Sequence, residues 1–138
     1  MSTAEFSPAE QGTLPGPGPS REELLSLHER MLLIRRTEER LRAGGGEAPG
    51  AVHLYIGEEA VAVGVCAHLE DRDYVTSTHR GHGHYLAKGG GLNAMLAEVW
   101  GKREGICSGM GGSMHVADIS KGILGANGIV DRRARVRG

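Results

Sequence analysis

The sequence predicts an α/β fold in which a parallel sheet is flanked by helices. Two segments with apolar residues at helical spacing lie between residues 20 and 69. A short β-branched and aromatic run follows at Tyr74 to Thr76, and a second candidate strand lies at Ile123 to Ala126. Helices followed by strands that end in glycine-rich loops are typical of the start of an α/β domain. Because two strands do not complete a parallel sheet, we expect an incomplete domain.

The amino-terminal part divides into a leader and a helix. Residues 1–19 end in a run of glycine and proline without apolar periodicity, which predicts a disordered leader. Ser20 and Glu23 form a capping box that starts a long helix, and Gly44 ends it. The expected inner face of this helix consists of Leu24, Leu27, Met31, Ile34 and Leu41. The domain itself is expected to occupy residues 20–130.

Two further helices and a loop are predicted in the middle of the chain. Glu58 to Leu69 is rich in small apolar residues, which indicates a helix that is buried between neighbours or packed against a sheet. Ser77 to Gly89, with the sequence STHRGHGHYLAKG, is predicted to be a loop after the first strand. Asn93 is expected to cap a helix that continues to Trp100. Most of residues 101–130 is expected to be glycine-rich loop.

The last eight residues, 131–138, differ in character from the rest of the chain. Their sequence is DRRARVRG, in which four residues are arginine. A basic surface tail is one interpretation. A shifted reading frame in GC-rich coding sequence also produces arginine-rich text, and we favour a frameshift or truncation as the explanation.

Composition and charge exclude several classes of protein. The formal net charge is −1, and no face combines basic with aromatic residues, so we expect no nucleic-acid partner. No apolar run approaches the roughly 20 residues that cross a membrane, and the first residues do not form a signal peptide. We therefore expect a cytoplasmic protein without a membrane partner. Cys66 and Cys107 lack the paired spacing of zinc or disulfide sites and are expected to be reduced thiols.

Histidines surrounded by glycines are the main indication of a functional site. His53 lies in GAVHLYIG, His79 and Arg80 lie in STHRGHGH, and His115 ends GMGGSMH. Glycine allows a backbone to approach a ligand closely, while histidine and arginine offer donors for a phosphate or a carbonyl. Histidine is also a common metal ligand, so a zinc hydrolase is an alternative for His79, His82 and His84. That alternative is disfavoured because the metallo-β-lactamase-like loop Thr-His-x-His-x-Asp-His has glycine here at both Gly81 and Gly83.

Five motifs, in the same order along the chain, resemble a known family. They are MLLIRRTEERL, HLYIGEEAVAVG, STHRGHGH, GGSMH and LGANGIV, between Met31 and Val130. Together they resemble the amino-terminal part of the alpha subunit of thiamine diphosphate-dependent 2-oxoacid dehydrogenases. Within this family, the acetoin dehydrogenase alpha subunits are the most similar in these motifs.

The resemblance implies roles for five residues. His53 matches a catalytic histidine near the substrate. His79 and Arg80 match a pair that contacts the cofactor, and Gly128 and Val130 match backbone contacts to its aminopyrimidine side. The physical chemistry agrees, because a guanidinium group can bind two diphosphate oxygens and glycine allows close backbone approach.

The resemblance also implies cofactors, partners and a reaction. Thiamine diphosphate would bind through Mg²⁺ between this subunit and a beta subunit. Acetoin or a 2-oxoacid such as pyruvate would be cleaved, and the two-carbon unit would pass to a lipoyl-bearing acyltransferase. The family's magnesium ligands follow the GIV motif in a Gly-Asp-Gly segment that this sequence lacks, so we expect no metal ligand in this chain. We therefore expect an alpha subunit that is truncated and inactive alone, and the alternative is a non-catalytic remnant or assembly fragment.

Overall fold

A computed structural model describes residues 18–44, 46 and 48–128 of the chain. In chain order the elements are α1 (Arg21–Gly44), α2 (Glu59–Cys66), β1 (Val75–Ser77), α3 (His82–Ala87), α4 (Leu92–Val99), the 3-10 helix η2 (Ile119–Lys121) and β2 (Ile123–Ala126). The predicted leader lies almost entirely outside these residues, as do Val130 and the tail 131–138. None of the described helices is long and apolar enough to cross a membrane.

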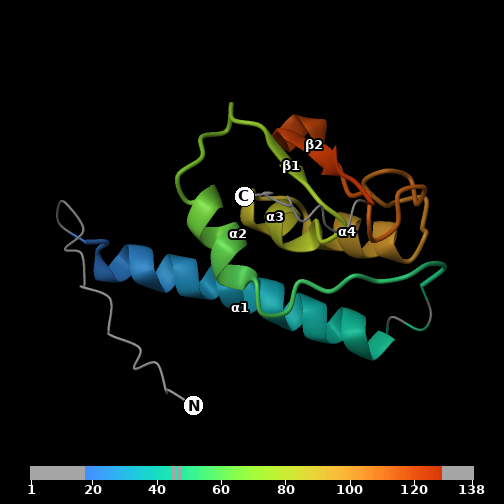
Figure 1. Ribbon diagram of the computed structural model, residues 1–138, viewed down its shortest axis with the longest axis horizontal. Helices are drawn as coiled ribbons and strands as arrows, with labels where there is room; N and C mark the ends of the chain where they lie inside the picture. The colour runs from blue at the N-terminus through green and yellow to red at the C-terminus, as the bar shows by residue number, and fades with distance from the viewer. Residues whose placement is uncertain (1–17, 45, 47, 129–138) are drawn as a thin grey trace, which may run out of the picture.

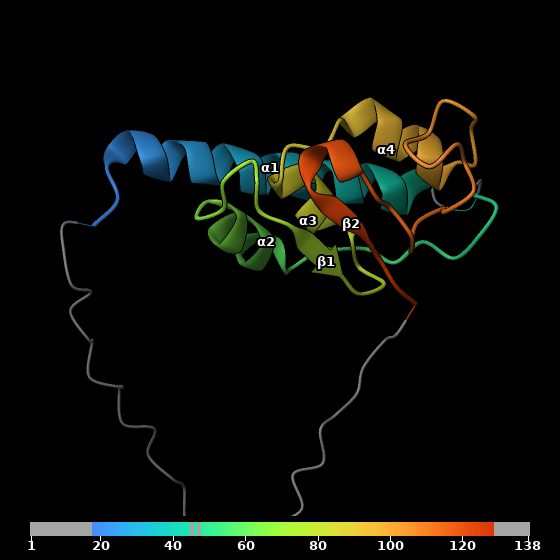
Figure 2. The ribbon, with the colours of Figure 1, turned by 90° about the horizontal axis from the view of Figure 1, so that it is seen from above.

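The two strands pair in parallel, which confirms the predicted α/β class. Ser77 at the end of β1 lies opposite Ala126 at the end of β2, and the register shifts between Val75 and Thr76. Helices α3 and α4 lie in the connection between the strands, as a parallel crossover requires. Both views show α3 between the long helix α1 and the strand pair (Figure 1; Figure 2). The carboxyl ends of the strands therefore meet at one edge, where α/β proteins bind ligands.

Helix α1 begins as its sequence predicts. The backbone N–H of Ser20 donates to Glu23 Oε2 at 2.7 Å, and the N–H of Glu23 donates to Ser20 Oγ at 3.2 Å. The carboxyl half of the predicted inner face is buried at Ile34 and Leu41, whereas Leu24 remains 52% exposed. Only the second half of α1 therefore packs deeply into the core.

The main core cluster consists of side chains from the helices and the neighbouring loops packed against β2. Its buried members are Ile34, Tyr55, Ala62, Val63, Cys66, Tyr85, Leu86, Ala87, Met95, Val116 and Ile123. Helix α2 is shorter than predicted and contributes one face, because Val61 and Val65 are 59% and 56% exposed. The predicted helix is therefore present, but its predicted extent to Leu69 is wrong, and it packs into the core through one face.

Two local predictions after β1 are also wrong. The segment predicted as a loop over Ser77 to Gly89 contains α3, whose Tyr85 and Leu86 side chains are buried in the core. Gly91, rather than Asn93, is the cap residue of α4, and it makes no side-chain hydrogen bond. In both places burial of apolar side chains outweighs the local preferences of glycine, histidine and asparagine.

Candidate functional site

Three segments that are distant in sequence meet beside the carboxyl end of β1. They are the extended segment around His53, the turn containing His79 and Arg80, and the end of the glycine-rich loop at Ser113. The imidazole rings of His53 and His79 lie edge to face, with centroids 5.0 Å apart and planes at 82°. Three of the predicted site residues are thus brought together. Gly128 is exposed and follows Asn127, whose N–H donates to the Ser77 carbonyl at 3.2 Å, so the backbone reaches the same edge there.

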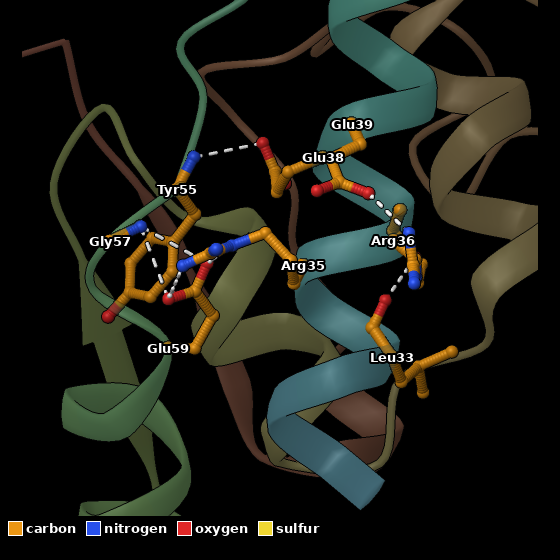
Figure 3. Close-up of polar contacts among 9 residues, drawn as sticks. Leu33, Arg35, Arg36, Glu38, Glu39, Tyr55, Gly57 and Glu59 are labelled. Carbon is orange, nitrogen blue, oxygen red and sulfur yellow. Dashed lines mark hydrogen bonds and ion pairs between the residues drawn. The ribbon is translucent and has the colours of Figure 1, made fainter.

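Side chains hold the segment that carries His53, which pairs with no strand in the part of the chain that the structure describes. The N–H of His53 donates to Ser113 Oγ at 3.1 Å, and the N–H of Tyr55 donates to Glu38 Oε2 at 2.9 Å. Between them, the carbonyl of Leu54 accepts a hydrogen bond from the Arg80 guanidinium. Figure 3 shows Glu38 reaching from α1 to the Tyr55 nitrogen. Backbone groups that would otherwise pair in a sheet are therefore satisfied by side chains.

A buried chain of polar groups joins Glu38, His82 and Ser113. Glu38 Oε1 lies 2.9 Å from His82 Nδ1, and His82 Nε2 lies 3.1 Å from Ser113 Oγ. Glu38 and His82 are fully buried, and Ser113 is 6% exposed. His82, which the sequence places in a probable ligand loop, instead links α1, α3 and the glycine-rich loop.

The third histidine of the motif, His84, is also engaged. Its Nδ1 lies 2.7 Å from Ser77 Oγ and its Nε2 lies 3.3 Å from the Tyr55 hydroxyl. Burial lowers the pKa of His84 below its ordinary value, so the ring is neutral at physiological pH. Burial, followed by the charge of Glu58, raises the pKa of Tyr55 to about 12. Both groups are therefore neutral hydrogen-bonding partners.

Glu98 organises the glycine-rich loop, a role that the sequence did not reveal. Its carboxylate accepts backbone N–H groups from Cys107, Gly109, Gly111 and Gly112, at distances from 2.6 to 3.1 Å. Burial alone would raise the pKa of Glu98, but these four hydrogen bonds bring it below the ordinary value. A Cβ at Gly105 would lie 2.5 Å from Glu98 Oε2, which explains glycine there. The loop is thus wrapped around a buried anion.

Glu38 and Glu98 share a signal that could have identified them. Each is a charged residue on the apolar face of a helix, Glu38 between Ile34 and Leu41, and Glu98 three residues after Met95. Charged residues are seldom fully buried unless they are paired. A glutamate at such a position therefore indicates a buried hydrogen-bonding role.

His79 and Arg80 differ from these saturated groups. His79 is 7% exposed, and within the described chain its Nδ1 is buried without a hydrogen-bond partner. Arg80 bonds to Leu54 and lies 3.9 Å from Glu58, a long separation for an ion pair. Burial, followed by the nearby His79 and Arg80, lowers the pKa of His53. A neutral His53 beside a cation and an unsatisfied histidine suits an anionic or carbonyl-bearing ligand.

No group of three or more metal-binding side chains is present among residues 18–44, 46 and 48–128. His82 and His84 have both ring nitrogens in hydrogen bonds with protein groups. The zinc hydrolase alternative therefore has no support from the geometry of this histidine cluster.

Comparison with known proteins assigns the family. Residues 29–137 match the family model described as Dehydrogenase E1 component. The chain is 58% identical, over 113 residues, to the alpha subunit of acetoin:2,6-dichlorophenolindophenol oxidoreductase from Bacillus subtilis, covering 80% of this chain and 34% of that protein. It is 55% identical over 112 residues to the subunit of the same name from Cupriavidus necator, covering 80% and 34%.

A pyruvate dehydrogenase E1 component alpha subunit, from Zymomonas mobilis, is 50% identical over 113 residues, covering 80% of this chain and 32% of that protein. The chain spans about a third of the length of these curated relatives. The match to the family covers most of the chain and includes every residue of the site. This chain belongs to the dehydrogenase E1 component family.

Proposed function

We propose that this chain supplies the diphosphate-binding side of the active site in a thiamine diphosphate-dependent dehydrogenase alpha subunit that acts on acetoin or pyruvate. The observation that carries the proposal is the buried Nδ1 of His79, which has no hydrogen-bond partner among the described residues and lies next to Arg80, with the His79 ring in contact with His53. His79 and Arg80 follow β1, at the strand edge where α/β domains bind ligands. Some relatives are named for acetoin and others for pyruvate, so the proposal leaves the substrate open between these two compounds.

The residues present fit the diphosphate but provide no shell for Mg²⁺. Arg80 can offer parallel N–H donors to anionic oxygens, and His79 has an unused polar atom beside it. Mg²⁺ requires a nearly octahedral set of oxygen ligands, and the described residues contain no group of three or more His, Cys, Asp or Glu side chains that could hold a metal ion. We therefore propose that the metal ligands come from outside the described residues and that the chain alone binds the cofactor weakly.

The bound cofactor would supply an electron sink for cleavage of a carbon–carbon bond next to a carbonyl. Arg80 would neutralise and orient the diphosphate. His53, kept neutral by its surroundings, can hold a proton on one ring nitrogen and accept one on the other, near the reacting oxygen of the substrate. Gly128 and Val130 are proposed to contact the aminopyrimidine through backbone groups.

A beta subunit and a lipoyl-bearing acyltransferase are the proposed partners. The described chain exposes several large apolar side chains, including Leu32, Leu33, Val61, Val65 and Met110. Val61 and Val65 lie four residues apart on α2 and so share one exposed face of that helix, and exposed apolar surface of this kind can pack against other protein segments. This exposure supports a subunit that works within an assembly, and it equally supports a non-catalytic assembly role.

A segment exchange tests the proposal. Residues 29–128 would replace the matching segment of the Bacillus subtilis alpha subunit, which would be assayed with its own beta subunit. We expect retained acetoin-dependent dye reduction, a higher cofactor requirement for Arg80→Ala, and lower turnover for His53→Ala. Arg103→Ala, at an exposed loop position, is the matched control. A correctly assembled but inactive hybrid would favour the non-catalytic role, and silent Arg80 and His53 variants would refute the assigned roles.

A further inference from the structure

The His53 segment is positioned by the two ends of one buried hydrogen-bond chain. Ser113 accepts the N–H of His53 at one end, and Glu38 accepts the N–H of Tyr55 at the other. His82 connects these two partners through its two ring nitrogens. A single polar chain thus contacts two alternate residues, His53 and Tyr55, in a segment that has no strand pairing with any described residue.

The donors and acceptors of this chain permit one fully satisfied arrangement. The His53 N–H can only donate, so it takes one lone pair of Ser113 Oγ and leaves the hydroxyl proton to be donated. That proton can go to His82 Nε2 if Nδ1 carries the imidazole hydrogen. Nδ1–H then donates to the Glu38 carboxylate, whose other oxygen accepts Tyr55.

Burial makes this arrangement rigid. Glu38 and His82 have no exposed surface, and Ser113 has little. In such surroundings hydrogen bonds are stronger, and an unsatisfied group is more costly than in water. The Glu98 carboxylate also fixes the N–H of Gly112, immediately before Ser113.

We propose that Ser113 is a positioning residue for His53, with its hydroxyl direction fixed by His82 and Glu38. It acts through the His53 backbone and thereby sets where the imidazole ring lies against His79. The consequence for catalysis rests on the function proposed above, whereas the positioning is a property of the chain alone.

A serine–histidine–carboxylate order also occurs in hydrolases, where the serine is a nucleophile. Ser113 does not suit that role because it is 6% exposed and its oxygen already accepts the His53 N–H. Covalent labelling of Ser113 by a fluorophosphonate probe would overturn the positioning role. We expect no labelling of the folded chain.

The unmodified 138-residue chain, labelled with nitrogen-15 and without cofactor, provides the first measurement. We expect NMR to show the Nδ1–H tautomer for His82. The Nε2–H tautomer would overturn the proposal, because Ser113 could not then donate to this ring. Since no cofactor is present, a failure here is distinct from a failure of the proposed function.

Amide hydrogen exchange of variants provides the second measurement. Ser113→Ala should speed exchange of the His53 N–H about tenfold, as expected for loss of one hydrogen bond, while the Tyr55 N–H changes much less. Ser108→Ala, in the same loop and exposed, is the control and should alter neither amide. An unchanged His53 amide in Ser113→Ala would overturn the proposal.

Glu38→Gln is a nearly isosteric variant that tests the other end. A carboxylate accepts twice, whereas an amide accepts once and donates once in this geometry. The variant must therefore lose the Tyr55 hydrogen bond, with faster exchange at Tyr55, or reverse the His82 tautomer, which NMR detects directly. If both amides stay protected and the tautomer is unchanged, the chain of hydrogen bonds does not set the segment.

Discussion

The loop of residues 105–113 and the turn of residues 78–81 both lie beside His53, but their polar groups are used differently. In the loop, four backbone N–H groups converge on Glu98. In the turn, His79 Nδ1 is buried without a partner in the described chain, and Arg80 has one hydrogen bond, to the Leu54 carbonyl, and a long contact with Glu58. The loop therefore resembles structural core, while the turn keeps unused capacity for a ligand. Glycine and histidine content alone does not separate these two cases.

Glu98→Ala should produce the largest effect. It would leave four N–H groups of a tightly folded loop without their acceptor, and we expect a loss of about 4 kcal/mol in the free energy of unfolding. Urea denaturation measures this loss. Glu104→Ala, at an exposed position immediately before this loop, should change stability by less than about 0.5 kcal/mol. If Glu98→Ala and Glu104→Ala lowered the free energy of unfolding equally, the loop would not depend on the Glu98 carboxylate, and the contrast with the turn would fail.

Gly83→Ala tests the packing directly behind the turn. A Cβ at Gly83 would overlap the buried ring of Tyr55, so we expect destabilisation by about 2 kcal/mol. Gly64→Ala in α2 is the matched control, because its Cβ would meet nothing within 4 Å. The control should stabilise the chain by about 0.5 kcal/mol through higher helix propensity. Thermal unfolding measures the stability of both variants. A Gly83→Ala variant as stable as the unmodified chain would show that the Tyr55 ring is not fixed in this position.

Glu59 is a second carboxylate whose hydrogen bonds are already satisfied within the chain, as those of Glu98 are. Its carboxylate accepts Arg35 Nε at 2.6 Å and the Gly57 N–H at 3.1 Å (Figure 3). The hydrogen bond from Arg35 lowers the pKa of Glu59 from 4.5 to about 2. Because the folded-state pKa is depressed, this contribution is complete above the unfolded-state value and is lost as pH falls toward the folded-state value.

Glu59→Gln should accordingly cost about 1 to 2 kcal/mol near neutral pH, after allowance for the partial exposure of Arg35. The difference from the unmodified chain should shrink as the pH falls from 4.5 toward 2. Urea denaturation across this range measures it. Glu39→Gln, which breaks a more exposed pair with Arg36, is the control and should cost less than about 0.5 kcal/mol. A constant difference at every pH would indicate that the Glu59 charge is not the cause.

Arg80→Ala should have the smallest effect on stability, about 1 kcal/mol or less, because it removes one hydrogen bond to Leu54. Its larger effect should be on binding of inorganic diphosphate, measured by calorimetric titration of the unmodified and variant chains. Weak binding by the unmodified chain should disappear in Arg80→Ala and persist in Arg103→Ala. Destabilisation as large as that of Glu98→Ala would place Arg80 with the structural groups and remove the distinction between loop and turn.

The sequence by itself determined the features that depend on neighbouring residues. The capping box of Ser20 and Glu23 starts α1 as expected, and the strand predicted at Ile123 to Ala126 is β2. The motifs were sufficient to identify the family, and His53, His79 and Arg80 do gather at one edge. Each of these features is set by chemistry within a few residues or by a motif.

Only the tertiary structure decided which polar groups are already satisfied. Helix α3 forms where histidine and glycine predict a loop, because His82 finds Glu38 and Ser113, 44 and 31 residues away. The buried Glu98 carboxylate is stable because it accepts four backbone N–H groups, which lie 9 to 14 residues after it in the sequence. A buried charge or imidazole is stable only when its partners are in place, and those partners meet only when the chain folds.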